Sequence, residues 1–263
     1  MNDLLQAKNN NETKIKVGAV SYLNTKPLIY GIEKGMMTDE VELHIGYPAK
    51  IAAELLSGTI DVGLVPVAII PLLKEAHIIS NYCIGCDGEV ATVAIFSDVP
   101  VNEIETVLLD YQSRTSVQLA QILLKNHWKV QPKFEAAATD FIEKIGGTTA
   151  AVIIGDRAFE QKGKFKYMFD LGAAWKAYTG LPFVFATWIS NKPLSDGFCT
   201  RFNAANAMGF EQLDTVIAQN PYPLFNLRQY YTQYIQFGLD DRKREGLQHF
   251  LHLLSENPAP NSH

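Results

Sequence analysis

The polar run Ser113-Arg114-Thr115-Ser116 is the segment of this sequence best suited to binding an anion. It joins the apolar residues 107–110, typical of a strand, to a long apolar segment of helical period. Unpaired N–H groups at a helix start attract an anion by about 0.3–1 kcal/mol, and an arginine can hold a carboxylate through two parallel hydrogen bonds. Ordinary N-capping by one hydroxyl is an equally weighted alternative, although it does not explain an arginine beside three hydroxyls.

Other polar turns also carry groups that a ligand could contact. Asn24 follows Ser21 and Tyr22 just after a predicted strand, a place where such residues are by default caps or turn residues. Asp156 comes after the apolar run 150–154, so its carboxylate either caps a neighbouring element or faces a cleft. A further turn consists of Thr179, Gly180, Leu181, Pro182 and Phe183. A structural role is the strong alternative to ligand contact for these residues.

The sequence motifs of several common enzyme classes are absent. There is no phosphate-binding P-loop, dinucleotide-binding glycine motif, metalloprotease zinc motif or nucleophile elbow. Cys83 and Cys86 are spaced as a C-x-x-C pair, but they end a predicted strand and only Cys199 remains to complete a zinc site, so we favour ordinary packing. The six histidines form no cluster. We therefore predict no metal and no cofactor.

Composition favours a globular protein with a small-molecule partner. The 263 residues are 47% hydrophobic, which is enough for one large or two modest domains. A net charge of -5 argues against nucleic acid or an anionic membrane as a partner. We find no secretory signal near the start, and the longest apolar run, residues 62–73, is too short to span a bilayer. We expect a cytoplasmic protein; its oligomeric state is not predicted.

Predicted strands and helices alternate along the chain. Strands at residues 14–20, 41–47 and 61–65 are separated by helices that begin near Pro27 and Pro48, a pattern typical of a mostly parallel sheet. A second α/β unit follows, and residues 194–255 have helical period almost throughout.

The sequence therefore predicts an α/β fold of two lobes with a helical C-terminal region and a ligand cleft between the lobes. The expected first lobe comprises residues 14–97 and 190–256, and the second comprises residues 98–189. Residues 1–13 and 257–263 are expected to be flexible tails.

Five motifs, in order along residues 14–190, together resemble the chorismate dehydratase family of menaquinone biosynthesis. Each motif alone is weak, whereas the five in register are specific. They are Val20-Ser21-Tyr22-Leu23-Asn24-Thr25-Lys26-Pro27-Leu28, Asp61-Val62-Gly63-Leu64-Val65-Pro66, Ser113-Arg114-Thr115-Ser116, Ile154-Gly155-Asp156 and Thr179-Gly180-Leu181-Pro182-Phe183-Val184-Phe185-Ala186. One stretch departs from the family: Cys86-Asp87-Gly88-Glu89-Val90 stands where a small polar residue and Gly-Pro-Val are usual. Thr92 replaces a usual serine and keeps its hydroxyl.

The resemblance implies a type II periplasmic-binding-protein-like fold and the dehydration of chorismate. In that reaction chorismate loses water to give 3-(1-carboxyvinyloxy)benzoate, which opens the futalosine pathway. The substrate is a dianion, so we expect Arg114 and the N–H groups near Thr115 and Ser116 to bind one carboxylate. Asn24 is expected to orient the substrate as a donor, because a neutral amide is a poor base; the substrate's own enolpyruvyl carboxylate could accept the proton. The other expected substrate-binding residues are Ser21, Tyr22, Thr92, Ser113, Asp156, Thr179, Gly180, Leu181, Pro182 and Phe183.

Two alternatives share this fold. A non-catalytic small-anion binding protein should carry a secretory signal or a lipoprotein cysteine near its start, and we find neither. The later futalosine-pathway enzyme of the same fold depends on a histidine in its second lobe, where only His127 stands in this sequence, near a predicted helix end. Both alternatives rank below the dehydratase.

Overall fold

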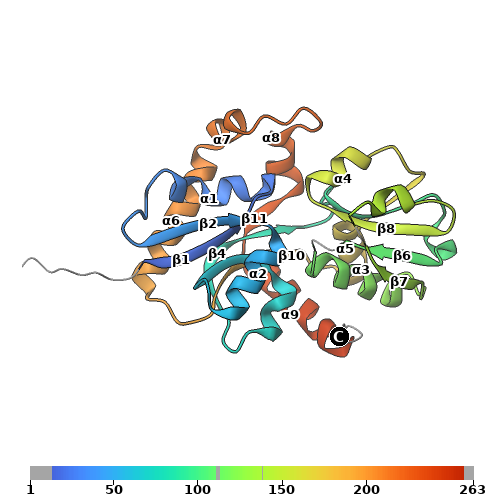
Figure 1. The fold of residues 1–263 in the computed structure, drawn as a ribbon, viewed down its shortest axis with the longest axis horizontal. Helices are drawn as coiled ribbons and strands as arrows, with labels where there is room; N and C mark the ends of the chain where they lie inside the picture. Colours follow the sequence, from blue (N-terminus) through green and yellow to red (C-terminus); the bar gives the residue numbers. More distant parts are fainter. Residues whose placement is uncertain (1–13, 111–112, 138, 258–263) are drawn as a thin grey trace, which may run out of the picture.

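The computed structural model describes residues 14–110, 113–137 and 139–257. Within them, two mixed β-sheets stand next to each other with helices against their faces (Figure 1). The tails expected at residues 1–13 and 258–263 lie outside the described residues. Asn257, which we expected to begin a flexible tail, instead accepts a hydrogen bond from Lys125 Nζ at 2.5 Å and donates one to the Leu253 carbonyl at 2.8 Å.

The six-stranded sheet is built on a parallel pair at the start of the chain. Its order is β11-β4-β10-β3-β1-β2. The central strands are almost entirely buried, which explains their continuous apolar sequences. The bounds are β1 (Ile15–Val20), β2 (Val41–Gly46), β3 (Val62–Pro66), β4 (His77–Cys86), β10 (Phe183–Ser190) and β11 (Gln236–Gly238).

The five-stranded sheet has the order β7-β6-β8-β5-β9. Its strand β6 is parallel to both neighbours, whereas β5 runs antiparallel between β8 and β9. The bounds are β5 (Val93–Ser97), β6 (Thr106–Leu109), β7 (Lys133–Ala136), β8 (Thr149–Ile154) and β9 (Tyr167–Asp170).

Strand pairing differs from the expected lobe limits at both places where the chain passes from one lobe to the other. We expected residues 93–97 in the first lobe, but β5 pairs with β8 and β9 of the second sheet. We expected residues 183–189 in the second lobe, but β10 pairs with β3 and β4 of the first. Both strands are apolar runs buried on both faces, so their local sequence suits either sheet, and only the partners decide.

The helices follow local sequence signals closely. Helix α2 has Pro48 in its first turn and ends at Gly58, whose φ of 75° is left-handed. Residues Phe141–Lys144 form a single 3₁₀ turn. The α-helices are α1 (Lys26–Glu33), α2 (Pro48–Ser57), α3 (Thr115–Asn126), α4 (Asp156–Gln161), α5 (Leu171–Thr179), α6 (Asp196–Glu211), α7 (Leu213–Gln219), α8 (Leu227–Gln229) and α9 (Asp241–Glu256). The 3₁₀ turns are η1 (Leu23–Thr25), η2 (Val67–Leu72), η3 (Val101–Glu103) and η4 (Phe141–Lys144), and η5 (Tyr230–Tyr234) is a π-helix.

Helix α6 packs closely on α1 because glycine leaves room for the contact. A Cβ on Gly209 would lie 1.8 Å from the Pro27 carbonyl oxygen, and one on Gly31 would lie 2.2 Å from that of Ala205. Neither position can therefore hold a larger residue at this helix spacing. The contact holds the start of α1, and with it the preceding turn η1, against the C-terminal region.

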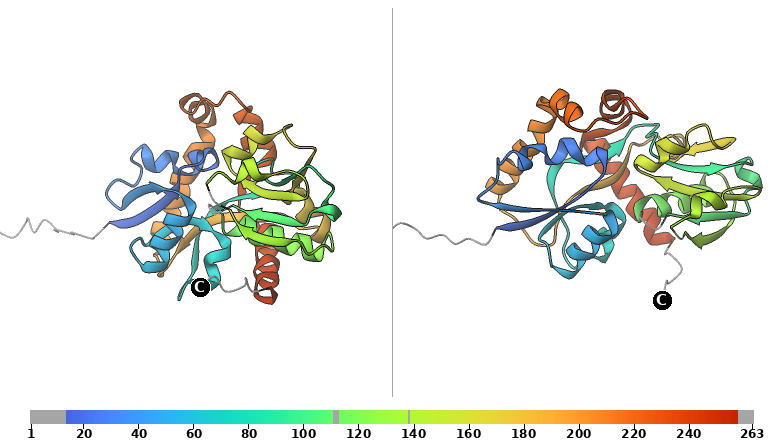
Figure 2. Two further views of the ribbon diagram at one scale, coloured as in Figure 1. Left: turned by 45° about the vertical axis from the view of Figure 1, so that its right-hand side comes forward. Right: turned by 45° about the horizontal axis from the view of Figure 1, so that its top comes forward.

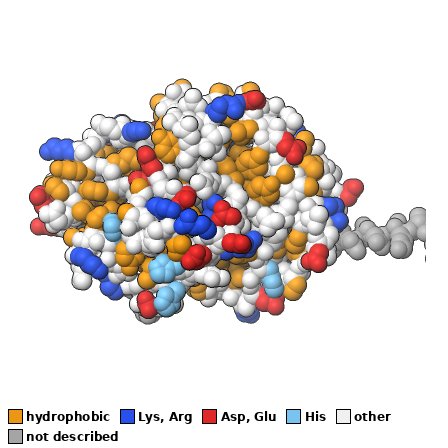
Figure 3. Space-filling model, turned by 180° about the vertical axis from the view of Figure 1, so that it is seen from behind, with side chains coloured by type: hydrophobic (Ala, Val, Ile, Leu, Met, Phe, Trp, Pro, Cys, Tyr) orange, Lys and Arg blue, Asp and Glu red, His pale blue; other side chains and the backbone are white. Residues whose placement is uncertain are grey.

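The C-terminal region is helical, as expected, with β11 and the π-helix as exceptions. Its last helix, α9, drawn in red, contacts β10 of the first sheet and α3 of the second lobe (Figures 1 and 2). In the described part of the chain, no helix combines the length and apolar character needed to cross a membrane. On the face shown in Figure 3, basic and acidic side chains are intermixed.

Candidate active site

A cavity lies where the two sheets and the C-terminal region meet. Its empty space, counted with its opening to solvent, is about 590 Å³. The carboxyl ends of β1, β3 and β8 point to it, as expected for ligand sites of α/β sheets. It is lined by Val20, Tyr22, Asn24, Pro48, Leu64, Pro66, Ile84, Val90, Thr92, Val93, Ser113, Thr115, Ser116, Ile154, Gly155, Phe185, Ala186 and Ile235.

The structure brings some of the expected site residues to this cavity and leaves others away from it. The residues that reach it are Tyr22, Asn24, Thr92, Ser113, Thr115 and Ser116. Those that do not line it are Ser21, Arg114, Asp156, Thr179, Gly180, Leu181, Pro182 and Phe183.

Arg114 stands at the N-cap position of α3 with its side chain exposed. Its neighbours Ser113, Thr115 and Ser116 line the cavity instead, because successive residues around a helix start face different directions. Among the described lining residues, none carries a formal positive charge. Any anion held here therefore depends on N–H and hydroxyl groups.

The start of α3 is organised by its own hydroxyls. The Ser116 N–H donates to Ser113 Oγ at 3.1 Å, so capping accounts for one hydroxyl, as the alternative interpretation expected. The buried Thr115 Oγ1 accepts the Ala68 N–H of η2 at 3.1 Å and thereby ties α3 to the first lobe. The positive end of the α3 dipole thus faces the cavity.

Asn24 lies in η1, at the end of the turn that follows β1. Its Nδ2 donates to Tyr230 Oη at 3.5 Å, whereas its Oδ1 is buried and has no hydrogen-bond partner among the described residues. Tyr230 Oη also lies 3.1 Å from Thr92 Oγ1. Sequence reasoning missed Tyr230, because no local signal links a residue in the C-terminal region to a turn near the start of the chain.

Asp156 opens α4 and faces η1 rather than the cavity. It accepts the backbone N–H of Leu23, and its own carbonyl accepts the Tyr222 hydroxyl at 3.1 Å. Burial raises the pKa of its carboxyl to about 6, against the opposing effects of the Leu23 N–H and Lys26. Of the two roles considered from the sequence, the structure therefore supports contact with a neighbouring element.

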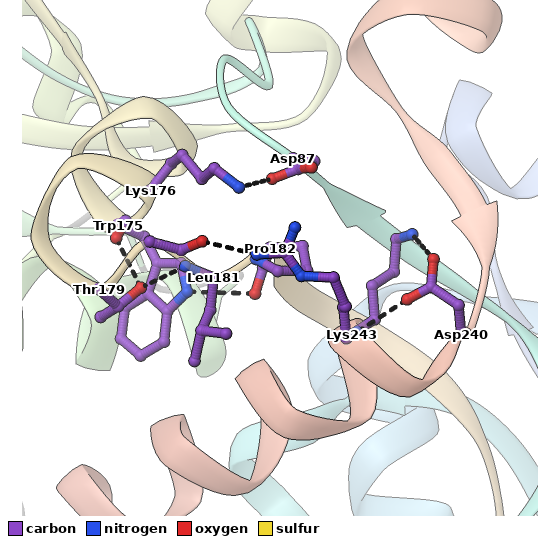
Figure 4. A network of polar contacts seen from close by, with 10 residues as sticks. Asp87, Trp175, Lys176, Thr179, Leu181, Pro182, Asp240 and Lys243 are labelled. Carbon is purple, nitrogen blue, oxygen red and sulfur yellow. Dashed lines mark hydrogen bonds and ion pairs between the residues drawn. The ribbon is translucent and has the colours of Figure 1, made fainter.

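The turn at residues 179–183 is held by contacts within the protein (Figure 4). Thr179 Oγ1 donates to the Trp175 carbonyl at 2.9 Å and accepts the Leu181 N–H at 3.1 Å. Trp175 Nε1 donates to the Pro182 carbonyl at 3.2 Å, and Phe183 packs edge-on against the Trp175 ring. This network connects α5 to β10, and it supports the structural interpretation of the turn.

The stretch that departs from the family leads from β4 to β5 and carries Val90 and Thr92 to the cavity. The Asp170 carboxylate accepts the N–H groups of Val90 at 3.1 Å and Ala91 at 2.8 Å. Ala91 has a φ of 64°, a left-handed conformation that costs energy for any residue but glycine. Asp170 is thus a residue that sequence reasoning missed, and it positions this wall of the cavity.

The cysteines pack in the interior, as expected. Cys83 and Cys86 are free and fully buried, and burial raises the pKa of both thiols. In the portion of the chain that the structure describes, no three His, Cys, Asp or Glu side chains come close enough to hold a metal ion.

Two mixed sheets with a cavity between them define a periplasmic-binding-protein-like protein. Its fold is similar to a protein of Archaeoglobus fulgidus, with a TM-score of 0.76, 13% identity, and coverage of 94% of this chain and 98% of that one. It is also similar to the periplasmic aliphatic sulphonate binding protein of Escherichia coli, with a TM-score of 0.59, 14% identity, and coverage of 93% and 92%. The expected fold class is confirmed.

The sequence defines the family more narrowly. The model of a menaquinone biosynthesis family matches residues 15–256, and this chain belongs to that family. A relative, the chorismate dehydratase of Thermus thermophilus, is 26% identical in an alignment that spans 93% of this chain and 96% of the relative.

Proposed function

We propose that this chain eliminates water from chorismate to give 3-(1-carboxyvinyloxy)benzoate, as a carbon–oxygen hydro-lyase of menaquinone biosynthesis. Family membership and the name of the Thermus thermophilus relative support this proposal. The main structural support is that Asn24 from one lobe and Thr92 from the other line the same cavity, beside the start of α3.

The proposed reaction makes few demands on the protein. The proton on the ring carbon that bears the enolpyruvyl ether and the hydroxyl on the neighbouring carbon leave, together forming water, and the ring becomes aromatic. Negative charge that develops as the proton leaves is delocalised toward the ring carboxylate. Because aromatisation drives the reaction, binding, orientation and charge stabilisation are the main contributions required of the site.

We assign one substrate carboxylate to the N-terminus of α3. The positive end of the α3 dipole and the Ser116 hydroxyl supply the attraction there. The exposed Arg114 guanidinium is not needed for this contact. Asn24 would face the other part of the substrate, and its Oδ1 has no hydrogen-bond partner in the described structure.

The proton acceptor in this proposal is the enolpyruvyl carboxylate of the substrate. Among the described residues that line the cavity, none has a carboxylate, an imidazole or an amine. The Asp156 carboxyl points to η1 instead. A substrate-derived base is consistent with this lining and leaves Asn24 as an orienting group.

The test is to incubate the purified protein with chorismate, without added metal or nucleotide, and to follow the products by chromatography with mass detection. A product one water lighter than chorismate, formed well above the no-enzyme rate, would support the proposal. Chorismate that stays intact but raises the melting temperature would instead favour the non-catalytic binding protein. Neither conversion nor binding would contradict the proposed substrate.

Replacing Asn24 by alanine is expected to lower kcat about 100-fold, the usual effect of removing one oriented polar contact in a reaction site. The fold should persist, because within the described residues the hydrogen bond from the Asn24 side chain to Tyr230 is long, at 3.5 Å. Turnover assays and thermal melts of the same preparation would separate the two effects. Unchanged turnover in this variant would remove Asn24 from the mechanism.

A further inference from the structure

The hydroxyl of Tyr230 touches two side chains that line the cavity but does not line the cavity itself. Its Oη accepts from Asn24 Nδ2 at 3.5 Å and lies 3.1 Å from Thr92 Oγ1. The Tyr230 side chain is fully buried. It reaches this place from the π-helix η5, so the C-terminal region joins the two lobes at the site.

One order of the protons in this group also satisfies the Val90 carbonyl. Thr92 Oγ1 also lies 3.4 Å from the Val90 carbonyl, which can only accept. If Thr92 donates to that carbonyl, the Tyr230 proton goes to Thr92, and the Tyr230 oxygen remains to accept from Asn24. The chain of donors therefore runs from Asn24 through Tyr230 and Thr92 to the backbone of Val90.

This order decides which way the Asn24 amide faces. A flipped amide would place Oδ1 against a phenol oxygen whose proton is already donated elsewhere, so two acceptors would face each other. The observed orientation avoids that repulsion and leaves Oδ1 buried and without a partner in the described structure. An asparagine has almost the same shape in both orientations, so a hydrogen bond of this kind is needed to distinguish them.

We propose that Tyr230 is a positioning residue: its hydroxyl, held by Thr92, fixes the orientation of the Asn24 amide at the cavity wall, where the amide orients the substrate. The inference rests on the proposed function for its kinetic consequence. Its structural part, the orientation of the amide, does not depend on the substrate.

The Tyr230 ring is held independently of its hydroxyl. It packs edge-on against Phe159, at 5.2 Å between ring centroids, and also contacts Phe225 and Tyr231. Tyr230→Phe therefore removes the hydroxyl and keeps the packing. Tyr231→Phe is a matched control, because Tyr231 is buried in the same π-helix and its hydroxyl donates to the Leu23 carbonyl at 2.8 Å.

The first measurement is the NMR signal pair of the Asn24 side-chain amide in the substrate-free protein, assigned by its loss in Asn24→Asp. We expect Tyr230→Phe to shift this pair and Tyr231→Phe to leave it in place. Thr92→Val should also shift it, whereas Thr92→Ser, which keeps the hydroxyl, should preserve it. Unchanged Asn24 signals in Tyr230→Phe and Thr92→Val would overturn the proposal even if the enzyme had no activity on chorismate.

The second measurement is the kinetics with chorismate. Tyr230→Phe is expected to lower kcat about threefold to tenfold with little change in KM, as befits one hydrogen bond, whereas Tyr231→Phe stays near the wild type. In an Asn24→Ala background, Tyr230→Phe should lower kcat no further. Two outcomes would overturn the positioning role. One is an equal loss of kcat in Tyr230→Phe and Tyr231→Phe; the other is that Tyr230→Phe lowers kcat as much in the Asn24→Ala background as it does in the wild type. Wild-type protein that does not convert chorismate would refute the proposed function, and the NMR result would still test the amide orientation.

Discussion

At the scale of single residues, buried polar atoms without partners gather around the turn η1. In the described structure, Asn24 Oδ1, Thr25 Oγ1 and Asp156 Oδ1 are buried and form no hydrogen bond. Each such atom costs about 1–3 kcal/mol when it is left unpaired. Of the three residues, Asn24 lines the cavity, which is consistent with a ligand that donates a hydrogen bond to its amide oxygen.

The Asp156 carboxyl makes the stability of the protein depend on pH. Its pKa is raised by burial from 3.8 to about 6, so between about pH 4 and pH 6 the folded protein keeps a proton that the unfolded chain has lost. The free energy of unfolding therefore falls as pH rises through this window and stays lower above it, by at most about 3 kcal/mol.

We expect Asp156→Asn, whose Oδ1 can still accept the Leu23 N–H, to be more stable than the wild type at pH 8 and to lose that advantage below about pH 4. Urea unfolding of both proteins across this range measures the difference. Lys26 and Glu160, the other charged groups near this carboxyl, are the same in both proteins, so their effects largely cancel. A stability difference that does not change with pH would contradict the raised pKa.

Arg114 provides a test of the anion site at the residue scale. Because its side chain is exposed and does not line the cavity, we expect Arg114→Gln to change KM for chorismate by less than about threefold, the effect of a weak surface charge. Steady-state kinetics gives the answer directly. An increase in KM of about 100-fold or more would mean that the guanidinium binds the substrate carboxylate, as the sequence alone suggested.

At the scale of secondary-structure elements, the connection from β4 to β5 is held by a side chain from the end of β9. Asp170 caps α5 through the Ala173 N–H at 2.9 Å and accepts the N–H groups of Val90 and Ala91. It therefore maintains the left-handed conformation of Ala91 just before Thr92 enters the cavity wall.

Asp170→Ala is expected to lower the free energy of unfolding by about 3 kcal/mol, because N–H groups that shared one carboxylate lose their acceptor. It should also lower kcat, since the connection that carries Thr92 is released. Asp170→Asn, which keeps one acceptor oxygen, should lie between this variant and the wild type. Urea unfolding with parallel turnover assays tests both effects, and an alanine variant as stable as the wild type would show that the connection does not need Asp170.

At the scale of the whole molecule, several hydrogen bonds join the lobes around the cavity. Thr115 of the second lobe accepts the Ala68 N–H of the first, and the C-terminal residues Tyr222 and Tyr231 reach Asp156 and Leu23. Helix α9 adds contacts to both lobes. The chain has a net charge of -5, yet the proposed substrate is a dianion, so attraction must come from short-range dipoles at the site.

Short-range attraction inside a cavity is screened little by salt. We therefore expect KM for chorismate to change less than about threefold between about 0.05 and 0.5 M sodium chloride, where the Debye length falls from above 10 Å to a few ångströms. Initial rates at several salt concentrations check this. A steep increase in KM with salt would indicate that exposed cationic side chains attract the substrate. Arg114 would then again be a candidate substrate-binding residue.

Local sequence determined much of the fold. The two periodicities of apolar residues reveal which face of each strand or helix is buried, and this predicted the α/β class and the helical C-terminal region. Pro48 likewise indicated the start of α2. Polar turns after strands left capping and ligand binding open for Asn24, Thr115 and Ser116, and the family resemblance implied substrate contact; all three residues line the cavity. These features depend on neighbours in the chain, so the sequence displays them.

Only the tertiary structure decided the rest. The sheet membership of β5 and β10 depends on their pairing partners, because both strands are apolar on both faces. The outward direction of Arg114 depends on small rotations at the start of α3. The contact between Asn24 and Tyr230 joins residues 206 positions apart. The periodicity of apolar residues indicates whether a side chain is buried, but it does not indicate which distant residue that side chain contacts. The packing of the whole chain determines those contacts.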